Sequence, residues 1–221
     1  MNQAQTKTSL VKKNNEQKYF DYCFLGRLSQ RNNFSRTDFS GKDFSGVNHS
    51  GKDFSEINFS NANLSLAIFV GTDFSRTDFS NADLSGADLS KTKLQKTNLS
   101  NAKLRGTKLR NANLCGAHFL NTDCSGANFS DVDLSGLILR GINFSGANLS
   151  GTKLREADLS AANFSGANLS GADFETANLE DAILSPRQII SALNMDAAIW
   201  GKSIALFQAA CSAFQAGIIK I

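Results

Sequence analysis

Apolar residues recur along this chain with a period of five, and the period runs from Phe34 to Leu184. Of the 31 positions in this register, 13 are Phe and 16 are Leu, and only His49 and Cys124 depart from the rule. We call the Phe or Leu position the centre of a repeat. Position −2 is small, with Ala 15 times and Thr 8 times, whereas position −1 is mostly Asp or Asn and position +1 mostly Ser. Such regularity predicts a repeat architecture.

A period of five matches neither standard secondary structure. On an α-helix, successive centres would spiral around the axis, and on a continuous strand they would alternate between the two faces. Glycine indicates where the chain turns, because all 14 glycines between Phe34 and Leu184 lie at position +2 and Asn occupies five more such positions. Both residues tolerate the positive φ that a type II turn requires at its third residue. Each repeat is therefore predicted to be a short extended piece followed by a corner.

The repeat unit, as in Ala82-Asp83-Leu84-Ser85-Gly86, closely resembles the consensus of the pentapeptide-repeat family. The resemblance implies an all-β fold, a right-handed quadrilateral β-helix with four repeats per coil and with the centre and position −2 facing inward. We expect nearly eight coils over 32–185, an N-terminal extension with a short helical cap over 1–31, and a C-terminal helical cap over 186–221.

Both ends of the repeat region carry signals for caps, which a solenoid needs to cover its terminal coils. Before the repeats, 15–28 is predicted as a short helix. After them, Ser185 and Pro186 are typical of a helix start, and Gln188 is placed to complete a capping box. A second helix is predicted to end near Ala216. This apolar C-terminal segment could also join two copies in a homodimer or touch a membrane.

Several inward positions depart from the small-residue rule. Lys42 and Lys52 at position −2 predict either a loosened first coil or side chains that reach outward, because a buried unpaired ammonium group is costly. The large residues Val132, Leu137 and Ile142 occupy three successive −2 positions, so we expect the coil to bulge there.

The overall charge is small, since 23 Lys and Arg against 20 Asp and Glu give +3. This value does not indicate a nucleic-acid or membrane partner. Seven basic residues nevertheless crowd one stretch that contains no acid between Asp88 and Asp123. This basic belt is a candidate site for an acidic partner, or else an ordinary solvated surface: Lys91, Lys93, Lys96, Lys103, Arg105, Lys108 and Arg110.

A second candidate site is apolar. Counting in steps of twenty places Ile138 above His118, and Arg140 above Leu120, on one face of the rod. We call these four residues the apolar patch. They could bind a partner, although single exposed apolar residues are also common on protein surfaces.

The sequence contains no arrangement typical of catalysis. We find no Ser-His-Asp set, metal cluster or phosphate-binding loop, and the four cysteines are widely spaced. We therefore expect no cofactor, no metal and no enzymatic activity. The N-terminus lacks the apolar run of a secretory signal, and a cytoplasmic protein is predicted. The preferred function is a scaffold that binds another protein, and the alternatives are a DNA-mimicking topoisomerase-binding protein and a membrane-associated repeat protein.

Overall fold

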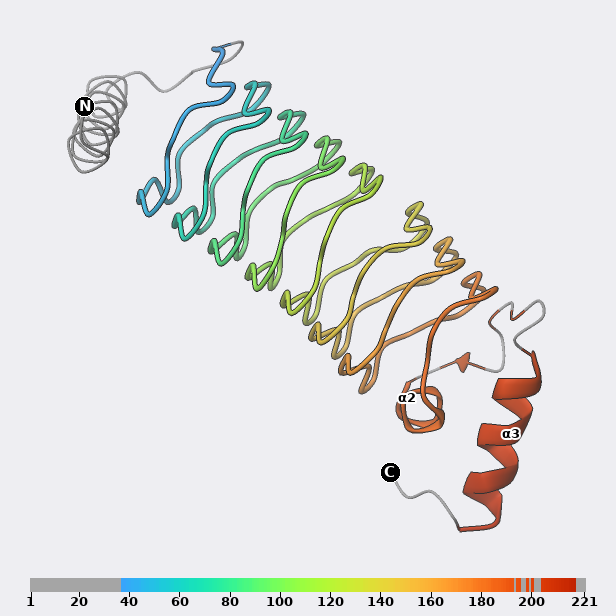
Figure 1. Ribbon diagram of the computed structural model, residues 1–221. Coiled ribbons are helices and arrows are strands. Elements are labelled where there is room, and N and C mark those ends of the chain that lie inside the picture. The colour runs from blue at the N-terminus through green and yellow to red at the C-terminus, as the bar shows by residue number, and fades with distance from the viewer. Residues whose placement is uncertain (1–36, 193, 196–197, 199, 201–203, 218–221) are drawn as a thin grey trace, which may run out of the picture.

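The computed structural model describes residues 37–192, 194–195, 198, 200 and 204–217 (Figure 1). They form a rod of stacked coils, with two helices at its C-terminal end. The helix predicted over 15–28 lies outside the described residues.

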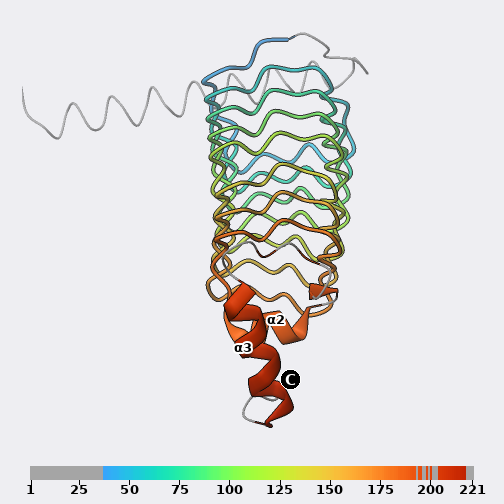
Figure 2. The ribbon, with the colours of Figure 1, turned by 90° about the vertical axis from the view of Figure 1, so that its right-hand side faces the viewer.

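Each coil takes twenty residues. Parallel β-bridges join residues twenty apart along the rod, from Asp38 with Asn58 to Asn163 with Ile183. Twenty residues are four repeats, so each turn has four sides, and the fold is a quadrilateral β-helix. Figures 1 and 2 show its stacked coils from two directions. The bridges are isolated because each side is so short that a corner follows the paired residue. The core therefore lies along the axis, between four columns of stacked side chains.

The inward positions are those that the sequence predicts. From Phe39 to Leu184 every centre is buried except His49, which is half-buried. Phenylalanines one coil apart stack, with ring centroids 5.4 Å apart for Phe39 and Phe59. Burying each such side chain contributes on the order of 1.5–3 kcal/mol before conformational entropy is subtracted. These columns hold the coils together.

Position +2 turns the corner, as predicted. Gly86 and Asn101 have φ values of 68° and 58° there. The Asp or Asn at position −1 supports the same corner, because its side-chain oxygen accepts the backbone N–H of the Ser at position +1, as from Ser85 to Asp83 at 3.0 Å. The five positions of the repeat thus have separate structural tasks.

The C-terminal cap begins where the sequence predicts. Helix α2 spans Pro186–Ser191, and Ser185 and Gln188 form the capping box. The amide of Gln188 also donates to the carbonyl oxygens of Phe164 and Ala167, at 2.6 and 2.9 Å. It thereby pairs the carbonyl of Ala167, which no backbone N–H of the coil reaches, and adds a second bond to that of Phe164, which also accepts the N–H of Ala167.

Helix α3, Ile204–Gln215, follows and lies against α2 (Figure 2). Its end agrees with the predicted one near Ala216. Among the helices of the described residues, none combines the length and the apolar character needed to cross a membrane.

The two inward lysines do not loosen the first coils. Lys42 is exposed and Lys52 is half-buried. Their carbonyl oxygens still accept the N–H groups of Asn63 and Asp73, each at 2.9 Å. The backbone therefore keeps its pairing at both lysines. Of the two predicted outcomes, a loosened coil or an outward side chain, Lys42 adopts the second.

Candidate functional site

A regular ladder of backbone hydrogen bonds joins successive coils. On one side of the rod, Leu99 N–H donates to the oxygen of His118 at 2.8 Å, and His118 N–H donates back to Thr97 at 2.9 Å. The corner adds a third bond, from Asn101 N–H to Leu120 at 2.8 Å. This set repeats along the rod.

The ladder is interrupted one coil later. Within the described rod, eight successive bonds between 111–122 and 130–143 do not reach hydrogen-bond geometry. The β-bridge expected between His118 and Ile138 is missing, whereas the bridges on the two flanking sides, Asn113 with Asp133 and Asp123 with Asn143, persist. The eight donors concerned are the N–H groups of Asn111, Leu114, Gly116, Phe119, Asn121, Asp133, Ile138 and Asn143. Those of Leu114, Asp133 and Asn143 are only stretched, because they belong to the persisting bridges, and the side that carries Phe119 and Ile138 is the open one. The two coils are visibly further apart than their neighbours (Figure 1).

The cause is the run of large residues at position −2. Val132, Leu137 and Ile142 lie one coil beyond Ala112, Ala117 and Thr122, and all three are buried. A single large residue fits at the normal coil spacing, as the buried Ile57 does with its ladder bonds intact, but three in succession need more room. The predicted distortion is confirmed in place, but it separates two coils rather than bulging one.

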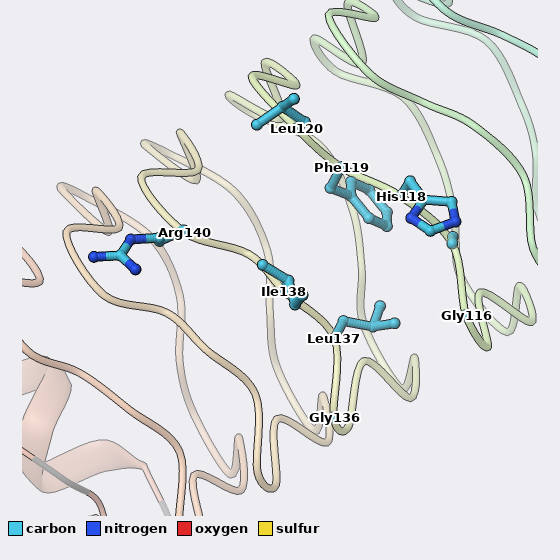
Figure 3. Close-up of a pocket in the computed structure, with 9 residues that line it drawn as sticks. Gly116, His118, Phe119, Leu120, Gly136, Leu137, Ile138 and Arg140 are labelled. Atoms are coloured by element: carbon cyan, nitrogen blue, oxygen red, sulfur yellow. The ribbon is translucent and has the colours of Figure 1, made fainter.

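The opening exposes a pocket of about 360 Å³ on the side of the rod (Figure 3). We call it the inter-coil groove. Side chains of both coils line it, and all four residues of the predicted apolar patch are among them: Gly116, Ala117, His118, Phe119, Leu120, Gly136, Leu137, Ile138 and Arg140. Leu120 and Ile138 are 67% and 74% exposed. The structure thus brings the predicted patch together.

Sequence reasoning missed the floor of this groove. Phe119 and Leu137 were expected to be core residues, and they are buried. Phe119 and Leu137 line the groove only because the two coils are separated at this place. The only sign of this floor in the sequence was Leu137, a large residue at a position that is usually Ala or Thr.

Charge in the groove comes from Arg140, which is exposed. In the part of the chain that the structure describes, no carboxylate lies within ion-pair distance of its guanidinium group. Most other arginines of the rod have such a partner, as Arg155 has in Asp173. Arg140 is therefore a cation beside two exposed apolar side chains.

The basic belt is largely neutralised by neighbouring coils. Five of its seven members form ion pairs, because stacking brings acids from twenty or so residues away: Lys93 with Asp73 at 3.0 Å, Lys103 with Asp83 at 3.7 Å, Lys108 with Asp88 at 3.5 Å, Arg105 with Asp123 at 2.5 Å, and Arg110 with Asp131 at 3.2 Å. Among the described residues only Lys91 and Lys96 of the belt lack an ion-pair partner. The gap in acids along the sequence is not a gap in space.

These pairs affect the acids as well. Partial burial alone would raise the pKa of Asp83, but hydrogen bonds from Ser85 and the charge of Lys103 outweigh it, and the pKa is lowered. The pKa of Asp88 is lowered in the same way, against the effect of its burial, by Ser90 and Lys108. Both carboxylates are ionised at neutral pH. Exposed pairs of this kind contribute about 0–1 kcal/mol each to stability.

Reactive groups elsewhere are few. Burial raises the pKa of the Cys124 thiol well above its usual value, and Asp123 adds to the effect, so this inward cysteine is unreactive. Cys115 is exposed, and neither residue is in a disulfide. Within the described ranges, no group of three or more His, Cys, Asp or Glu side chains could hold a metal ion.

Comparison with known proteins agrees with the coil geometry. A family model described as pentapeptide repeats matches in eight copies, within residues 38–76, 57–95, 72–111, 97–136, 107–146 and 142–181. A search of curated proteins found no match.

Three solved structures illustrate the similarity. QnrB1, a plasmid-mediated fluoroquinolone resistance protein, is 24% identical over 82% of this chain and 92% of its own, with a TM-score of 0.47. A pentapeptide repeat protein from the thylakoid lumen of Arabidopsis thaliana is 36% identical over 43% of this chain and 70% of its own, with a TM-score of 0.36.

HetL from the cyanobacterium Nostoc, involved in the regulation of heterocyst differentiation, is 26% identical over 74% of this chain and 81% of its own, with a TM-score of 0.34. The family model extends over well more than half of the chain, and its period is the period of the observed coils. The chain therefore belongs to the pentapeptide-repeat family, whose fold is the right-handed quadrilateral β-helix.

Proposed function

We propose that this protein is a non-catalytic scaffold that binds another protein, and that the inter-coil groove is its binding surface. One observation carries the proposal. Leu120 and Ile138, 67% and 74% exposed, flank a pocket at the one place within the described rod where eight successive ladder bonds are missing. Apolar side chains beside a concavity are typical of the centre of a protein interface.

The basic belt is a weaker candidate for the same role. Five of its residues already form ion pairs within the rod. An acidic partner would have to compete with Asp73, Asp83 and Asp88 for the same cations. Lys91 and Lys96 could add attraction, but they do not form a site of their own.

A DNA-mimicking topoisomerase-binding protein needs a strongly negative surface. The net charge of +3 and the pairing of aspartates with lysines along the rod count against that alternative. A homodimer through the C-terminal cap stays a secondary proposal, motivated by Phe214 of α3, which is 44% exposed.

The test is site-specific cross-linking. A photoreactive amino acid is placed at Ile138 and, in a matched control, at Ile68, the same residue at the same repeat position, 40% exposed. Ile68 lies 70 residues before Ile138, which is three and a half turns of the twenty-residue coil, so the two residues face opposite sides of the rod. Extracts of the source organism supply the partner, which is then purified.

The purified partner is titrated against Ile138→Asp and Ile68→Asp. Burying an isoleucine contributes about 1.5–3 kcal/mol, so we expect Ile138→Asp to weaken binding by roughly tenfold or more. Ile68→Asp should bind as the parent does. Equal affinity of both variants would show that the groove is not the binding surface.

A further inference from the structure

We propose that the inter-coil groove binds an extended peptide strand, which pairs through its own backbone with the open edges of the two coils. The inference rests on the proposed function, since it specifies how a protein partner would engage that groove. The occupant is a partner segment in extended conformation, with apolar side chains at alternate positions and a carboxylate placed to reach Arg140.

The backbone on the near side of the groove presents an unpaired strand edge. In the coil before the opening, the N–H groups of Phe119 and Asn121 and the carbonyl oxygen of Ala117 make none of their ladder bonds. The donors lie two residues apart, as they do on the edge of a parallel strand. One coil earlier the equivalent groups, in Leu99 and Asn101, are bonded at 2.8 Å each.

The far side presents the complementary edge. The carbonyl oxygens of Ile138 and Arg140 and the N–H of Ile138 make none of their ladder bonds. One coil later the equivalent groups are bonded, since Leu139 and Gly141 donate to Asp158 and Ser160 at 2.8 Å. The near edge therefore offers two donors and one acceptor, the far edge offers two acceptors and one donor, and each has the spacing of a β-strand.

Unpaired backbone groups need partners from outside the chain. Leaving a backbone N–H or C=O unsatisfied and away from water costs about 1–3 kcal/mol. An extended peptide supplies donors and acceptors at the same two-residue spacing, which is the chemistry of strand addition. A helix has its own backbone bonded internally and could use only the side chains of the groove.

Side chains of the groove specify the rest of the occupant. Leu120 and Ile138 come from successive coils, at positions +1 and −1 of the same side. They fit apolar side chains that project from one face of an extended peptide. Arg140 has no ion-pair partner among the described residues and lies at the edge of the groove (Figure 3). Because no carboxylate among the described residues neutralises its charge, Arg140 favours a carboxylate in the occupant.

The experiment uses the full-length protein and a synthetic library of fluorescent heptapeptides. Valine or isoleucine occupies alternate positions, and one aspartate is placed at each remaining position in turn. The tightest binder is then remade with backbone N-methyl groups on alternate residues, which removes hydrogen-bond donors and keeps every side chain. We expect N-methylation in one of the two alternating registers to weaken binding at least tenfold, and in the other register to have less effect.

A variant of the protein, in place of a modified peptide, tests the role of the open backbone edges. Leu137→Ala combined with Ile142→Thr restores the residue types that position −2 carries elsewhere, so the coils can close and rebuild their ladder. We expect at least tenfold weaker peptide binding. Amide hydrogen exchange should show newly protected N–H groups at Phe119 and Asn121, which proves closure independently of binding. Val47→Ala at another −2 position is the matched control, with unchanged peptide affinity.

The following results would contradict the proposal that an extended peptide binds through its backbone. If the N-methylated peptides in both registers bind as tightly as the parent, or if a closed variant binds as well, then side chains alone hold the partner and the inference is wrong. If no library peptide binds while the partner cross-linked at Ile138 still loses affinity on Ile138→Asp, the inference fails and the proposed function stands. If that variant has no effect on the partner, the proposed function fails first.

Discussion

Inward polar side chains in this rod depend on backbone carbonyl oxygens for hydrogen bonds. The hydroxyl groups of Thr77 and Thr107 donate to Phe54 and Leu84 in the preceding coil, at 2.7 and 2.8 Å. Threonine can therefore replace alanine at position −2 without leaving a buried donor unpaired. His49 differs, because its Nε2 atom is buried and has no hydrogen-bond partner among the described residues.

His49 should make stability depend on pH. Burial, and to a lesser extent the charge of Lys52, lowers the pKa of His49 from its ordinary value of 6.5. The unfolded chain then binds the proton more readily than the folded one. This histidine has no effect well above pH 6.5, and stability is lost as the pH falls below 6.5 toward the lowered pKa of the folded state.

We predict that His49→Phe, which restores a common residue of this position, removes that loss. The melting-temperature difference between variant and parent should widen as the pH falls from 7 to 5. Aspartates whose pKa is lowered, such as Asp83 and Asp88, lose their contribution only as the pH falls below about 3.8, so the two effects separate. A constant difference across this range would contradict the assignment.

At the scale of elements, the side chain of Gln188 links the C-terminal cap to the rod. Gln188 closes the capping box with Ser185 at 2.7 Å and also donates to two carbonyl oxygens of the coil beneath. Helix α2 has only six residues, too few to be stable alone. Its stability therefore comes from contact with the rod.

We predict that Gln188→Ala destabilises the protein by roughly 1–3 kcal/mol, because it leaves the carbonyl oxygen of Ala167 unpaired and removes one of the two hydrogen bonds that the carbonyl of Phe164 accepts. Arg187→Ala, an exposed neighbour in the same helix, serves as the control and should change stability by less than about 0.5 kcal/mol. Urea unfolding of the three proteins measures both values. Equal midpoints for all three would mean that the cap does not depend on this amide.

The rod and this cap could be predicted because each depends on local sequence. A five-residue unit contains its own centre, its small inward residue and its corner, and Ser185, Pro186 and Gln188 lie within four positions. The inward side chains of Val132, Leu137 and Ile142 were visible as exceptions to the same rule, so the place of the distortion was predictable too.

What the sequence did not reveal depends on pairing between coils. The basic belt was expected to lack acids, yet Asp73, Asp83 and Asp88 lie beside its lysines, because twenty residues along the chain are only one coil in space. The apolar patch was correctly stacked by counting in twenties. The groove beneath the patch was not predicted. Its size depends on how far the backbones of the two coils move apart to accommodate larger inward side chains.

At the scale of the whole molecule, stability passes from coil to coil. Each coil of a solenoid contacts only its neighbours, so the rod is as cooperative as its weakest junction. At the junction between 111–122 and 130–143, eight ladder bonds fall outside hydrogen-bond geometry and one of the β-bridges is missing, whereas the Phe and Leu columns continue through it. The rod should therefore unfold as two blocks that meet there.

We predict two transitions in urea, one for each block. The combined Leu137→Ala and Ile142→Thr variant should merge them into a single, steeper transition if its coils close, because the ladder then spans the junction. Hydrogen exchange should show protection that drops at Phe119 and Asn121 in the parent protein. One sharp transition in the parent, with uniform protection along the rod, would contradict a weak junction.

The twenty-residue coil also governs which changes of length the protein can accept. Removing one repeat of five residues would rotate everything beyond it by one side of the square, so Ile138 would no longer lie above His118, and Lys103 would lose Asp83. Removing four repeats together would shorten the rod by one coil and leave all columns aligned beyond the cut. Insertions and deletions in this protein should therefore survive mainly in multiples of twenty residues, and any shorter change between the two coils of the groove would take the binding surface apart while leaving each block folded.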